Sequence, residues 1–397
     1  MRLLVASDQW SPDAIGGSAR VAADTARALA ARGHAVSAIV PAQPDRPARA
    51  LEDGVEVLRV LRRGRLPQTI GDRLQTRRAA RSLPSSSFDI LVGHQSSTAA
   101  GLAAGMPELP LALVFHASAV LERRYLRSRA SGRERVLLGA LEPALVAFER
   151  RAVTRAAAIL VLSEYSRELV LSRHPDAADR IRQVRGGVGS AFLAPPRETA
   201  AAVRARHGIP PEAVFLLTTR RLEPRMGLEE LIAALASVAD ERFVLAVTGD
   251  GAGRAALEDL VRSLSLNERV RFLGRVDEDE LRSLYAAADL FVLPTVAYEG
   301  FGMSTIEALA SGTPVLGTAV GATPEILAPL DAALIVPRAD SAAIAEGLRR
   351  IVPRLTPELR SRCASWARAE YAWQEAIEPW EAALERAIDA KRVAGNL

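Results

Sequence analysis

The stretch Leu290-Phe-Val-Leu-Pro-Thr-Val-Ala-Tyr-Glu-Gly-Phe-Gly-Met-Ser-Thr-Ile-Glu307 joins an apolar strand to a helix through a glycine-rich turn. The run Leu290–Pro294 is predicted to be the strand, and the helix is predicted to begin near Met303. Two carboxylates, Glu299 and Glu307, bracket the turn. A surface loop needs neither a close pair of glycines nor a fixed relation between two acids, so we interpret the stretch as a site.

The start of the helix after this turn predicts an anion-binding site. The second glycine lets a ligand approach the backbone closely, and the first helical amides have no carbonyl partner one turn earlier. Together with the helix dipole, these amides attract an anion, typically a phosphate. Glu307 can accept hydrogen bonds from vicinal hydroxyls such as a ribose diol, and Glu299 can do the same for a sugar beyond the phosphates. An acid-capped helix is the structural alternative, but it does not require Glu299.

The rest of the chain repeats the order of strand and helix. Predicted strands in the first half are Leu3–Ser7, Val36–Val40, Val55–Val60, Asp89–Gly93, Leu111–His116 and Ala158–Leu162. Those in the second half are Val214–Thr219, Phe243–Thr248, Val270–Leu273, Leu290–Pro294, Pro314–Gly317 and Ala333–Val336. Predicted helices include Gly17–Ala31, Arg135–Arg151, Gly227–Val238 and Asp277–Ala287. This alternation is typical of βαβ units with helices on both faces of a parallel sheet, so we predict an α/β fold.

A change of composition at residues 185–197 predicts a domain boundary, because three glycines and two prolines cluster there. We therefore expect a doubly wound domain at residues 1–190 and another at residues 191–371. The segment 357–393 is predicted to be helical and contains Trp366, Tyr371, Trp373 and Trp380. Such large aromatic side chains indicate helices docked on the body, with residues 372–397 crossing back to the N-terminal domain. Two facing α/β domains would leave a cleft, and ligands of open parallel sheets bind beyond the carboxyl ends of the strands.

Length and composition narrow the class of protein. A chain of 397 residues usually forms more than one core, and its 49% hydrophobic residues are ample for burial. No apolar run approaches the roughly 20 residues of a membrane span, and the N-terminus lacks the layout of a signal peptide. Cys363 is the only cysteine, which excludes an internal disulfide and a thiolate-rich metal site. We expect a soluble, cytoplasmic protein.

Charge is distributed unevenly along the chain. Residues 1–190 carry 28 basic and 18 acidic residues, a net charge of +10, while residues 191–397 carry 23 and 29, a net charge of −6. Much of the basic excess lies in the blocks 58–65 and 121–129. A basic half can attract anionic lipid or an acidic acceptor, so a peripheral membrane contact stays open beside ordinary solvated faces. Nucleic acid is not an expected partner, because aromatic residues are only 5% and no nucleic-acid-binding motif is present.

The segment from Glu299 to Val315 resembles the Glu-x7-Glu motif of the family 4 glycosyltransferases. The nearby Gly321-Ala-Thr-Pro-Glu325-Ile is similar to that family's Gly-Gly-x-Pro-Glu-Ile segment. The resemblance implies the GT-B fold, with two Rossmann-like domains facing a cleft. It also implies transfer of a sugar from a nucleoside diphosphate with retention at the anomeric carbon, and no need for a bound metal or another cofactor.

Three further matches follow in the family's order. Ile15-Gly16-Gly17-Ser18 corresponds to a glycine loop near the diphosphate and acceptor, and its position before a helix is typical of a phosphate nest. His116 ends a strand where the family has a histidine near the donor sugar, whereas His94, which also follows a strand, is kept as an alternative. Arg221 matches an arginine that grips the diphosphate. The family's lysine a few residues later is replaced by Met226, so Arg225 next to it is a candidate surrogate.

The resemblance extends the donor site to glycines and a loop in the second half. Gly249 and Gly251 border the family's nucleotide pocket, and Arg275-Val276 falls where the family holds the base. The acids at residues 277–280 are interpreted as a helix cap rather than a metal site. The predicted catalytic residues are His116, Arg221 and Glu299. The predicted donor-binding residues are Gly16, Gly17, Arg225, Gly249, Gly251, Arg275, Val276, Gly300, Phe301, Gly302, Met303, Ser304, Thr305 and Glu307.

The predicted function is that of a retaining hexosyltransferase using a nucleotide sugar, with UDP as the commonest donor nucleotide. Two alternatives stay open: a sugar-nucleotide epimerase of the same architecture, and a non-catalytic sugar-nucleotide-binding protein that lost its lysine at position 226. The acceptor, which can be a small natural product, a glycan or a lipid-linked sugar, is not specified by the sequence.

Overall fold

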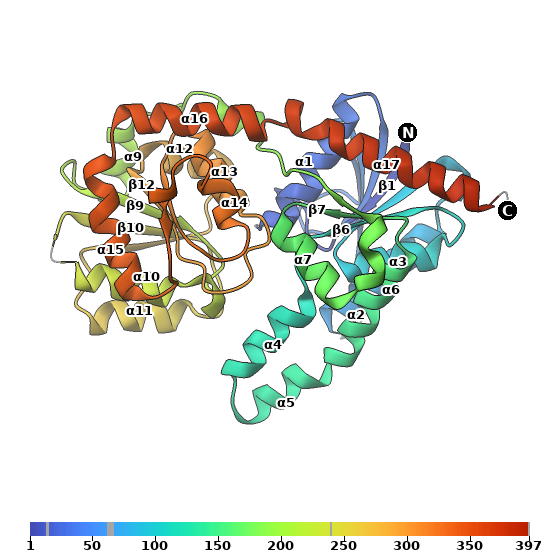
Figure 1. The fold of residues 1–397 in the computed structure, drawn as a ribbon, viewed down its shortest axis with the longest axis horizontal. Helices are drawn as coiled ribbons and strands as arrows, with labels where there is room; N and C mark the ends of the chain where they lie inside the picture. The colour runs from blue at the N-terminus through green and yellow to red at the C-terminus, as the bar shows by residue number, and fades with distance from the viewer. Residues whose placement is uncertain (13–15, 62–66, 239, 396–397) are drawn as a thin grey trace. The chain divides into compact units, whose positions relative to one another are not determined.

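The computed structural model describes residues 1–12, 16–61, 67–238 and 240–395. The chain divides into two compact units, one formed by Met1–Gly187 together with Trp373–Leu397 and the other by Val188–Ala372. Each unit is built on one sheet (Figure 1). The sequence analysis places its boundaries after residues 190 and 371. The α/β fold with two Rossmann-like parallel-sheet domains is confirmed.

The first unit contains an eight-stranded sheet in the order β3-β4-β2-β1-β5-β6-β7-β8. Every neighbouring pair is parallel except β3 and β4, which are antiparallel. The strands are β1 (Arg2–Ala6), β2 (Ala35–Pro41), β3 (Arg49–Glu52), β4 (Val55–Val60), β5 (Ile90–His94), β6 (Leu111–Phe115), β7 (Ala158–Val161) and β8 (Ile181–Gln183). The inner strands β5, β6 and β7 are fully buried, which matches their continuous apolar runs. The edge strands β3 and β8 were not predicted.

Helices cover both faces of this sheet. The helices of this unit are α1 (Gly17–Ala31), α2 (Gln68–Arg81), α3 (Ser96–Gly105), α4 (Ala119–Arg129), α5 (Gly132–Ala140), α6 (Glu142–Arg155), α7 (Glu164–Arg173) and α17 (Trp373–Gly395), of which α4 and α5 project from the sheet (Figure 1). The helix predicted at Arg135–Arg151 is two helices, α5 and α6, so that prediction was wrong. Pro143 lies in the first turn of α6, where its missing amide costs nothing, and it cannot continue α5.

The second unit contains a wholly parallel six-stranded sheet in the order β11-β10-β9-β12-β13-β14. Its strands are β9 (Val214–Thr219), β10 (Phe243–Thr248), β11 (Val270–Gly274), β12 (Leu290–Leu293), β13 (Val315–Thr318) and β14 (Ile335–Val336). Its helices are α8 (Ser190–Leu193), α9 (Ala200–Arg206), α10 (Leu228–Ser237), α11 (Arg254–Ser263), α12 (Glu278–Ala287), α13 (Met303–Ala310), α14 (Thr323–Leu327), α15 (Ser341–Ile351) and α16 (Pro357–Tyr371). The order places the carboxyl ends of β9 and β12 side by side at the centre of the sheet.

The last helix, α17, docks on the first unit, as expected from its aromatic residues. It packs against α1 and against the strands β5 to β7. Trp380 is fully buried, and its indole Nε1 donates a hydrogen bond to the Arg185 carbonyl at 2.8 Å. The ring of Trp373 fills the space over Gly187, where any side chain would clash with it. The final helix therefore completes the core of the unit that the N-terminus begins.

No helix within the described parts of the chain combines the length and the apolar character that crossing a membrane requires. The basic block at 58–65 reaches into residues 62–66, which lie outside the described residues.

Candidate active site

The predicted site residues belong to both units, and each unit holds a separate group of them. In the second unit they follow the carboxyl ends of β9, β10, β11 and β12. In the first unit they follow β1, β5 and β6. Helices begin at or after these strand ends, so the topology gathers the predicted residues at one edge of each sheet.

The start of α13 is shaped by Gly302. This glycine caps the helix in the left-handed conformation, with φ 92° and ψ 56°. A side chain there would come within 3.2 Å of the Thr305 hydroxyl oxygen. The Thr305 amide donates to the Gly302 carbonyl at 2.9 Å, whereas the amides of Met303 and Ser304 at the start of the first turn have no backbone acceptor among the residues that the structure describes. The Thr305 hydroxyl is buried and has no hydrogen-bond partner among the described residues, so a ligand here would satisfy it.

Glu299, before this turn, is held by a buried cation. Its Oε2 accepts hydrogen bonds from Arg220 Nη2 at 2.8 Å and from the Thr295 hydroxyl at 2.8 Å. Burial alone would raise the pKa of Glu299, but the charge and hydrogen bonds of Arg220 and Thr295 outweigh it and lower that pKa. Glu299 therefore stays ionised in a position where an unpaired carboxylate would not.

The backbone around Glu299 is also constrained. Tyr298 has φ 59°, an uncommon conformation for a non-glycine residue, which costs energy and is concentrated at functional sites. The Glu299 carbonyl accepts a hydrogen bond from the Ala322 amide at 2.9 Å. At Gly321 a side chain would come within 2.1 Å of the same carbonyl. The two stretches that carry the family resemblance, one around Glu299 and one starting at Gly321, are thus in direct contact.

Glu307 lies on α13 and is almost fully buried. One of its carboxylate oxygens accepts a hydrogen bond from the Tyr285 hydroxyl of α12 at 3.2 Å. Phe301, in the turn, packs edge-on against Tyr371 with ring centroids 6.0 Å apart. Gly300 lies between Glu299 and this anchored ring, so the turn is held at both ends.

The three arginines after β9 have different environments. Arg221 is 41% exposed and forms an ion pair with Glu223 at 3.1 Å. Arg225 is buried, and its Nη1 donates to the Tyr298 carbonyl at 3.2 Å. Its charge also contributes to the lowered pKa of Glu299, so Arg225 lies close to that carboxylate. Met226 is buried as well and adds only apolar surface.

Arg220 is one of the residues that the sequence analysis missed at this site. Its side chain is 6% exposed and bonds both Thr295, at 2.6 Å, and Glu299. The signal was present in the sequence, because two arginines follow a strand directly and successive side chains of an extended segment point to opposite sides. The two side chains were therefore expected to face different surroundings, and only the family resemblance favoured Arg221.

The glycines after β10 are explained by contacts within the protein. A side chain at Gly249, where φ is 116°, would come within 1.9 Å of the Arg220 carbonyl. At Gly251 it would come within 2.6 Å of the Leu222 carbonyl. These glycines let the turn pack against the arginine loop, and their predicted contact with a donor stays a prediction.

The loop after β11 contains the residues predicted to hold a base. Arg275 is exposed and Val276 is half-buried. The next residue, Asp277, caps α12 by accepting a hydrogen bond from the Glu280 amide at 2.8 Å, as the acidic run predicts. Across the described ranges there is no group of three or more His, Cys, Asp or Glu side chains placed to hold a metal ion. That metal is not required for the reaction stays a prediction.

In the first unit the two histidines after neighbouring strands are in contact. His94 Nδ1 lies 2.9 Å from His116 Nε2, and the rings stack with centroids 5.1 Å apart. Burial lowers the pKa of His116 to about 4. Burial, and then the charge of His116, lower the pKa of His94 well below its usual range. Both rings are therefore neutral near pH 7, and a single proton lies between the two facing nitrogens.

Two other features mark this part of the first unit. Gln95, directly after His94, has φ 73°, another uncommon conformation for a side-chain-bearing residue. Gly16 caps α1 with φ 153°, and a side chain there would come within 3.1 Å of the Gln9 side-chain oxygen. Gly17 is the first residue of α1 and is exposed. Ile15, the first residue of the predicted glycine loop, lies outside the described residues.

The comparisons with known proteins agree on one family for both halves of the chain. The model for glycosyl transferases group 1 matches residues 200–370, and the model for glycosyltransferase family 4 matches residues 15–190. A D-inositol 3-phosphate glycosyltransferase of Mycolicibacterium smegmatis is 30% identical over 255 residues, which cover 63% of this chain and 58% of that protein. The chain thus spans little more than half the length of this relative. A D-inositol 3-phosphate glycosyltransferase 1 of Catenulispora acidiphila is 28% identical over 393 residues, covering 93% of this chain and 90% of that protein.

Solved structures share the fold. Sucrose-phosphate synthase from Thermosynechococcus elongatus superposes with a TM-score of 0.80 at 23% identity, covering 98% of this chain and 99% of that one. Anabaena Alr3699/HepE in complex with UDP-glucose superposes with a TM-score of 0.76 at 16% identity, covering 97% and 99%. The two family models lie one in each half of the chain, in the order that the motifs predict. The chain belongs to the family 4 glycosyltransferases with the GT-B type of fold.

Proposed function

We propose that the protein is a retaining glycosyltransferase that moves a hexose from a nucleoside diphosphate sugar, with UDP as the first candidate nucleotide, to an acceptor hydroxyl. The observation that carries this proposal is the start of α13. There two first-turn amides and the buried Thr305 hydroxyl, which find no acceptor or donor within the described part of the chain, lie between two fixed carboxylates, Glu299 and Glu307. A diphosphate supplies the acceptor oxygens that these donors lack, and its sugars supply hydroxyls for the carboxylates.

The carboxylates would bind opposite ends of the donor. Glu307, fixed by Tyr285, accepts hydrogen bonds from the ribose hydroxyls. Glu299, kept ionised by Arg220, accepts from hydroxyls of the hexose. Hydrogen bonds to an ionised acceptor contribute about 1.5–3 kcal/mol each, so two such pairs specify a sugar nucleotide over a free phosphate.

Positive charge for the leaving diphosphate would come from Arg221 and Arg225. Arg221 is exposed enough to exchange its contact with Glu223 for a phosphate oxygen. Arg225 is fixed beside Glu299 and offers a guanidinium in place of the lysine that Met226 replaces. Stabilisation of charge that develops on the departing phosphate lowers the barrier for transfer.

The proposed transfer breaks the bond between the anomeric carbon and the β-phosphate oxygen. The acceptor oxygen forms its bond to the same face of that carbon, and its proton passes to the departing phosphate. The histidine pair serves as a neutral hydrogen-bonding group for a sugar hydroxyl, because His116 is deprotonated near neutral pH. Related proteins named as glycosyltransferases, and a structural neighbour bound to UDP-glucose, support the choice of a sugar nucleotide as the donor.

Donor binding is tested by calorimetric titration of UDP, GDP and ADP. We expect Glu307→Gln to weaken the preferred nucleotide by about 10-fold to 100-fold, the value of a charged hydrogen bond. The matched control is Glu268→Gln, because that acid lies in the same unit and its side chain is 95% exposed. Equal affinity of Glu307→Gln and the control would contradict the ribose assignment.

Activity is tested by incubating labelled sugar nucleotides with candidate acceptors and determining the anomeric configuration of the product by NMR. A product with the donor's configuration supports retention, and an inverted product contradicts it. Conversion of the donor without an acceptor would indicate an epimerase instead. Because arginines and amides are proposed to stabilise the phosphates, we expect transfer to persist in EDTA. Loss of activity that Mg²⁺ restores would contradict the proposal that no metal ion is required.

A further inference from the structure

Helices α4 and α5 form a hairpin that projects from the sheet of the first unit (Figure 1). On α5 two consecutive apolar residues are exposed, Val136 by 72% and Leu137 by 69%. Single exposed apolar side chains are ordinary, but this adjacent pair on a projecting helix leaves most of its apolar surface in water. Nothing in the folding of this unit accounts for them.

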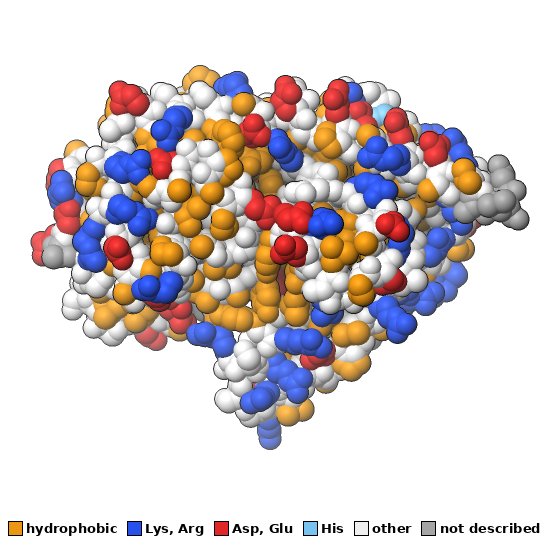
Figure 2. Space-filling view, in the orientation of Figure 1, with side chains coloured by type: hydrophobic (Ala, Val, Ile, Leu, Met, Phe, Trp, Pro, Cys, Tyr) orange, Lys and Arg blue, Asp and Glu red, His pale blue; other side chains and the backbone are white. Residues whose placement is uncertain are grey.

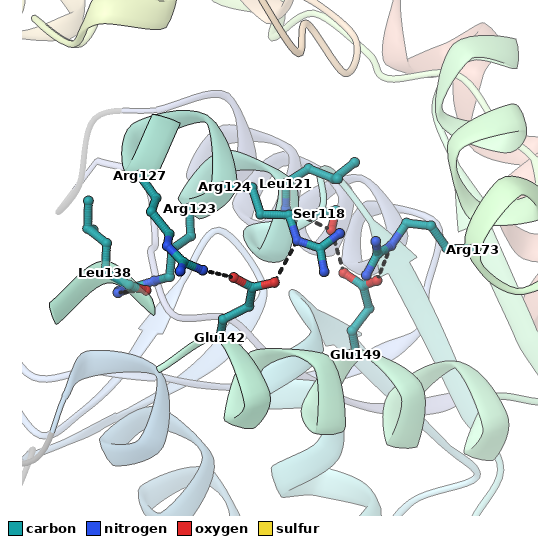
Figure 3. Close-up of polar contacts among 9 residues, drawn as sticks. All are labelled: Ser118, Leu121, Arg123, Arg124, Arg127, Leu138, Glu142, Glu149 and Arg173. Carbon is teal, nitrogen blue, oxygen red and sulfur yellow. Dashed lines mark hydrogen bonds and ion pairs between the residues drawn. The ribbon is translucent and has the colours of Figure 1, made fainter. Parts of the chain in front are cut away.

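The hairpin is an ordered element rather than a loose loop. Arg124 and Arg127 of α4 both bond the carboxylate of Glu142 at the start of α6, at 2.6 and 3.3 Å (Figure 3). Arg123 donates to the Leu138 carbonyl of α5 at 3.2 Å. These contacts tie α4 to α6 and α5 to α4, so Val136 and Leu137 are presented by a fixed support.

The base of the hairpin is anchored by a buried acid. Glu149 of α6 accepts hydrogen bonds from the Ser118 hydroxyl and from Arg173 Nε, both at 2.6 Å (Figure 3). Ser118 also caps α4 by accepting from the Leu121 amide. Burial opposes ionisation of Glu149, but its hydrogen-bond donors outweigh burial and lower its pKa. The entry into α4 is thus fixed to the body of the unit.

The charge on this hairpin is strongly positive. Arg129, Arg133 and Arg135 are exposed around the apolar pair, with Glu134 the only exposed acid between them. The arginine side chains gathered over the projecting hairpin are visible in Figure 2. We call this surface the hairpin face: Arg129, Arg133, Arg135, Val136 and Leu137.

The positive field continues onto the neighbouring helices. Arg73 of α2 stacks on the Phe148 ring of α6, so these helices adjoin. The pKa of Arg73 is lowered by burial and further by the positive charges of Arg151 and Arg77. Cations that repel one another across two helices are relieved by an anionic partner, which extends the attraction beyond the hairpin itself.

We propose that the hairpin face docks on an anionic lipid bilayer, with Val136 and Leu137 inserted among the acyl chains and the arginines at the phosphate level. The pairing of adjacent apolar side chains with surrounding arginines distinguishes this partner from nucleic acid, which would use the charges alone. Each basic residue at such a surface strengthens binding about fivefold. The proposal concerns a surface distinct from the donor site and does not depend on the proposed function.

The test is flotation of the full-length chain with vesicles of phosphatidylglycerol and phosphatidylcholine, and with phosphatidylcholine alone, at low salt. We expect binding to the anionic vesicles only. Val136→Glu/Leu137→Glu and Arg133→Glu/Arg135→Glu are each expected to weaken binding by at least about tenfold. All four side chains are exposed, so these variants should unfold at the wild-type temperature, which is measured alongside.

The matched control is Arg49→Glu/Leu51→Glu, which places one substitution of each kind on β3 of the same unit, where Leu51 is 78% exposed, and changes the net charge by an amount between those of the two test variants. The control should bind like the wild type. No binding to anionic vesicles at low salt would overturn the proposal, as would equal binding to neutral vesicles or an equal loss in the control. Retention of a duplex RNA by the wild type without any vesicle binding would also overturn it.

Discussion

At the scale of single residues, the pair Arg220 and Arg221 shows how neighbours after a strand take different tasks. Arg220 is buried against Glu299, whereas Arg221 lies at the surface beside Glu223. Removing one partner of a buried ion pair leaves an uncompensated charge and is far more costly than removing an exposed partner. We therefore expect Arg220 to contribute mainly to the stability of the fold and Arg221 mainly to ligand binding.

We expect Arg220→Ala to lower the free energy of unfolding by about 3–5 kcal/mol, because Glu299 then loses the cation that hydrogen-bonds it and keeps the nearby charge of Arg225. Arg221→Ala should change stability by no more than about 0.5 kcal/mol while weakening nucleotide diphosphate binding. Urea unfolding and calorimetric titration of both variants measure these effects. Equal destabilisation by the two substitutions would show that the contact with Glu299 does not stabilise the fold.

The histidine pair makes stability depend on pH. Burial lowers the pKa of His116 to about 4 from its ordinary 6.5. The unfolded chain therefore binds a proton at a higher pH than the folded chain does. The contribution of His116 to the free energy of unfolding is complete above about pH 6.5 and is lost as pH falls towards 4. Because His116 is only partly buried, we expect its share of the loss between pH 7 and 5 to be about 1–2 kcal/mol.

The measurement is denaturant unfolding of wild type and His116→Gln at pH 7 and pH 5. The variant should lose less stability over this interval than the wild type. His34→Gln is the control, since that histidine lies elsewhere in the first unit and bonds Glu381. An unchanged pH dependence in His116→Gln would contradict the lowered pKa.

The residue scale is also where sequence reasoning was least complete. Glu299, Glu307 and the glycines of the turn were found because their spacing relative to a strand and a helix is visible in one stretch. Tyr285, which holds Glu307, was not found, because it comes from another helix and only the folded packing brings it to that carboxylate. Thr295, which holds Glu299, lies in the same stretch but was not singled out, because a threonine after a strand is ordinary in a loop. Partners contributed by remote elements leave no local pattern.

At the scale of elements, the turn into α13 depends on a left-handed glycine. We expect Gly302→Ala to lower the free energy of unfolding by about 1–2 kcal/mol through backbone strain. Its added methyl group also crowds Thr305, so nucleotide affinity should fall. Gly33→Ala is the matched control, because Gly33 has φ +90° but open space around it.

Thermal unfolding and UDP titration of the two glycine variants separate strain from crowding. Both should be destabilised, but only Gly302→Ala should bind nucleotide more weakly. Equal nucleotide affinity in the two variants would contradict a ligand at the start of α13.

Element prediction succeeded where hydrophobic runs were long and buried. The bounds of β9, β10 and α1 are those predicted, because apolar strands and a glycine before an Ala-rich helix are unambiguous. Short edge strands such as β3 have a burial pattern with no buried residue, so they gave no hydrophobic signal. The break between α5 and α6 was missed because helical periodicity continues across Pro143.

At the scale of the whole molecule, α17 makes the first unit depend on the end of the chain. We expect Trp380→Ala to lower the unfolding free energy of that unit by about 3–5 kcal/mol, the usual cost of removing a buried tryptophan. Val393→Ala on the same helix, where the side chain is 64% exposed, should change it by no more than about 0.5 kcal/mol. Limited proteolysis followed by mass mapping should cut first within the first unit in Trp380→Ala; first cuts in the second unit would contradict the assignment.

This arrangement also has a consequence for how the polypeptide matures on the ribosome. Residues 188–372 leave the exit tunnel before the helix that covers β5 to β7, so the second unit can reach its native state while the first still exposes an uncovered apolar surface. A nascent chain that terminates early never acquires Trp380, and its leading half stays open to proteases and chaperones. Synthesis of α17 is thereby coupled to protection of the first unit.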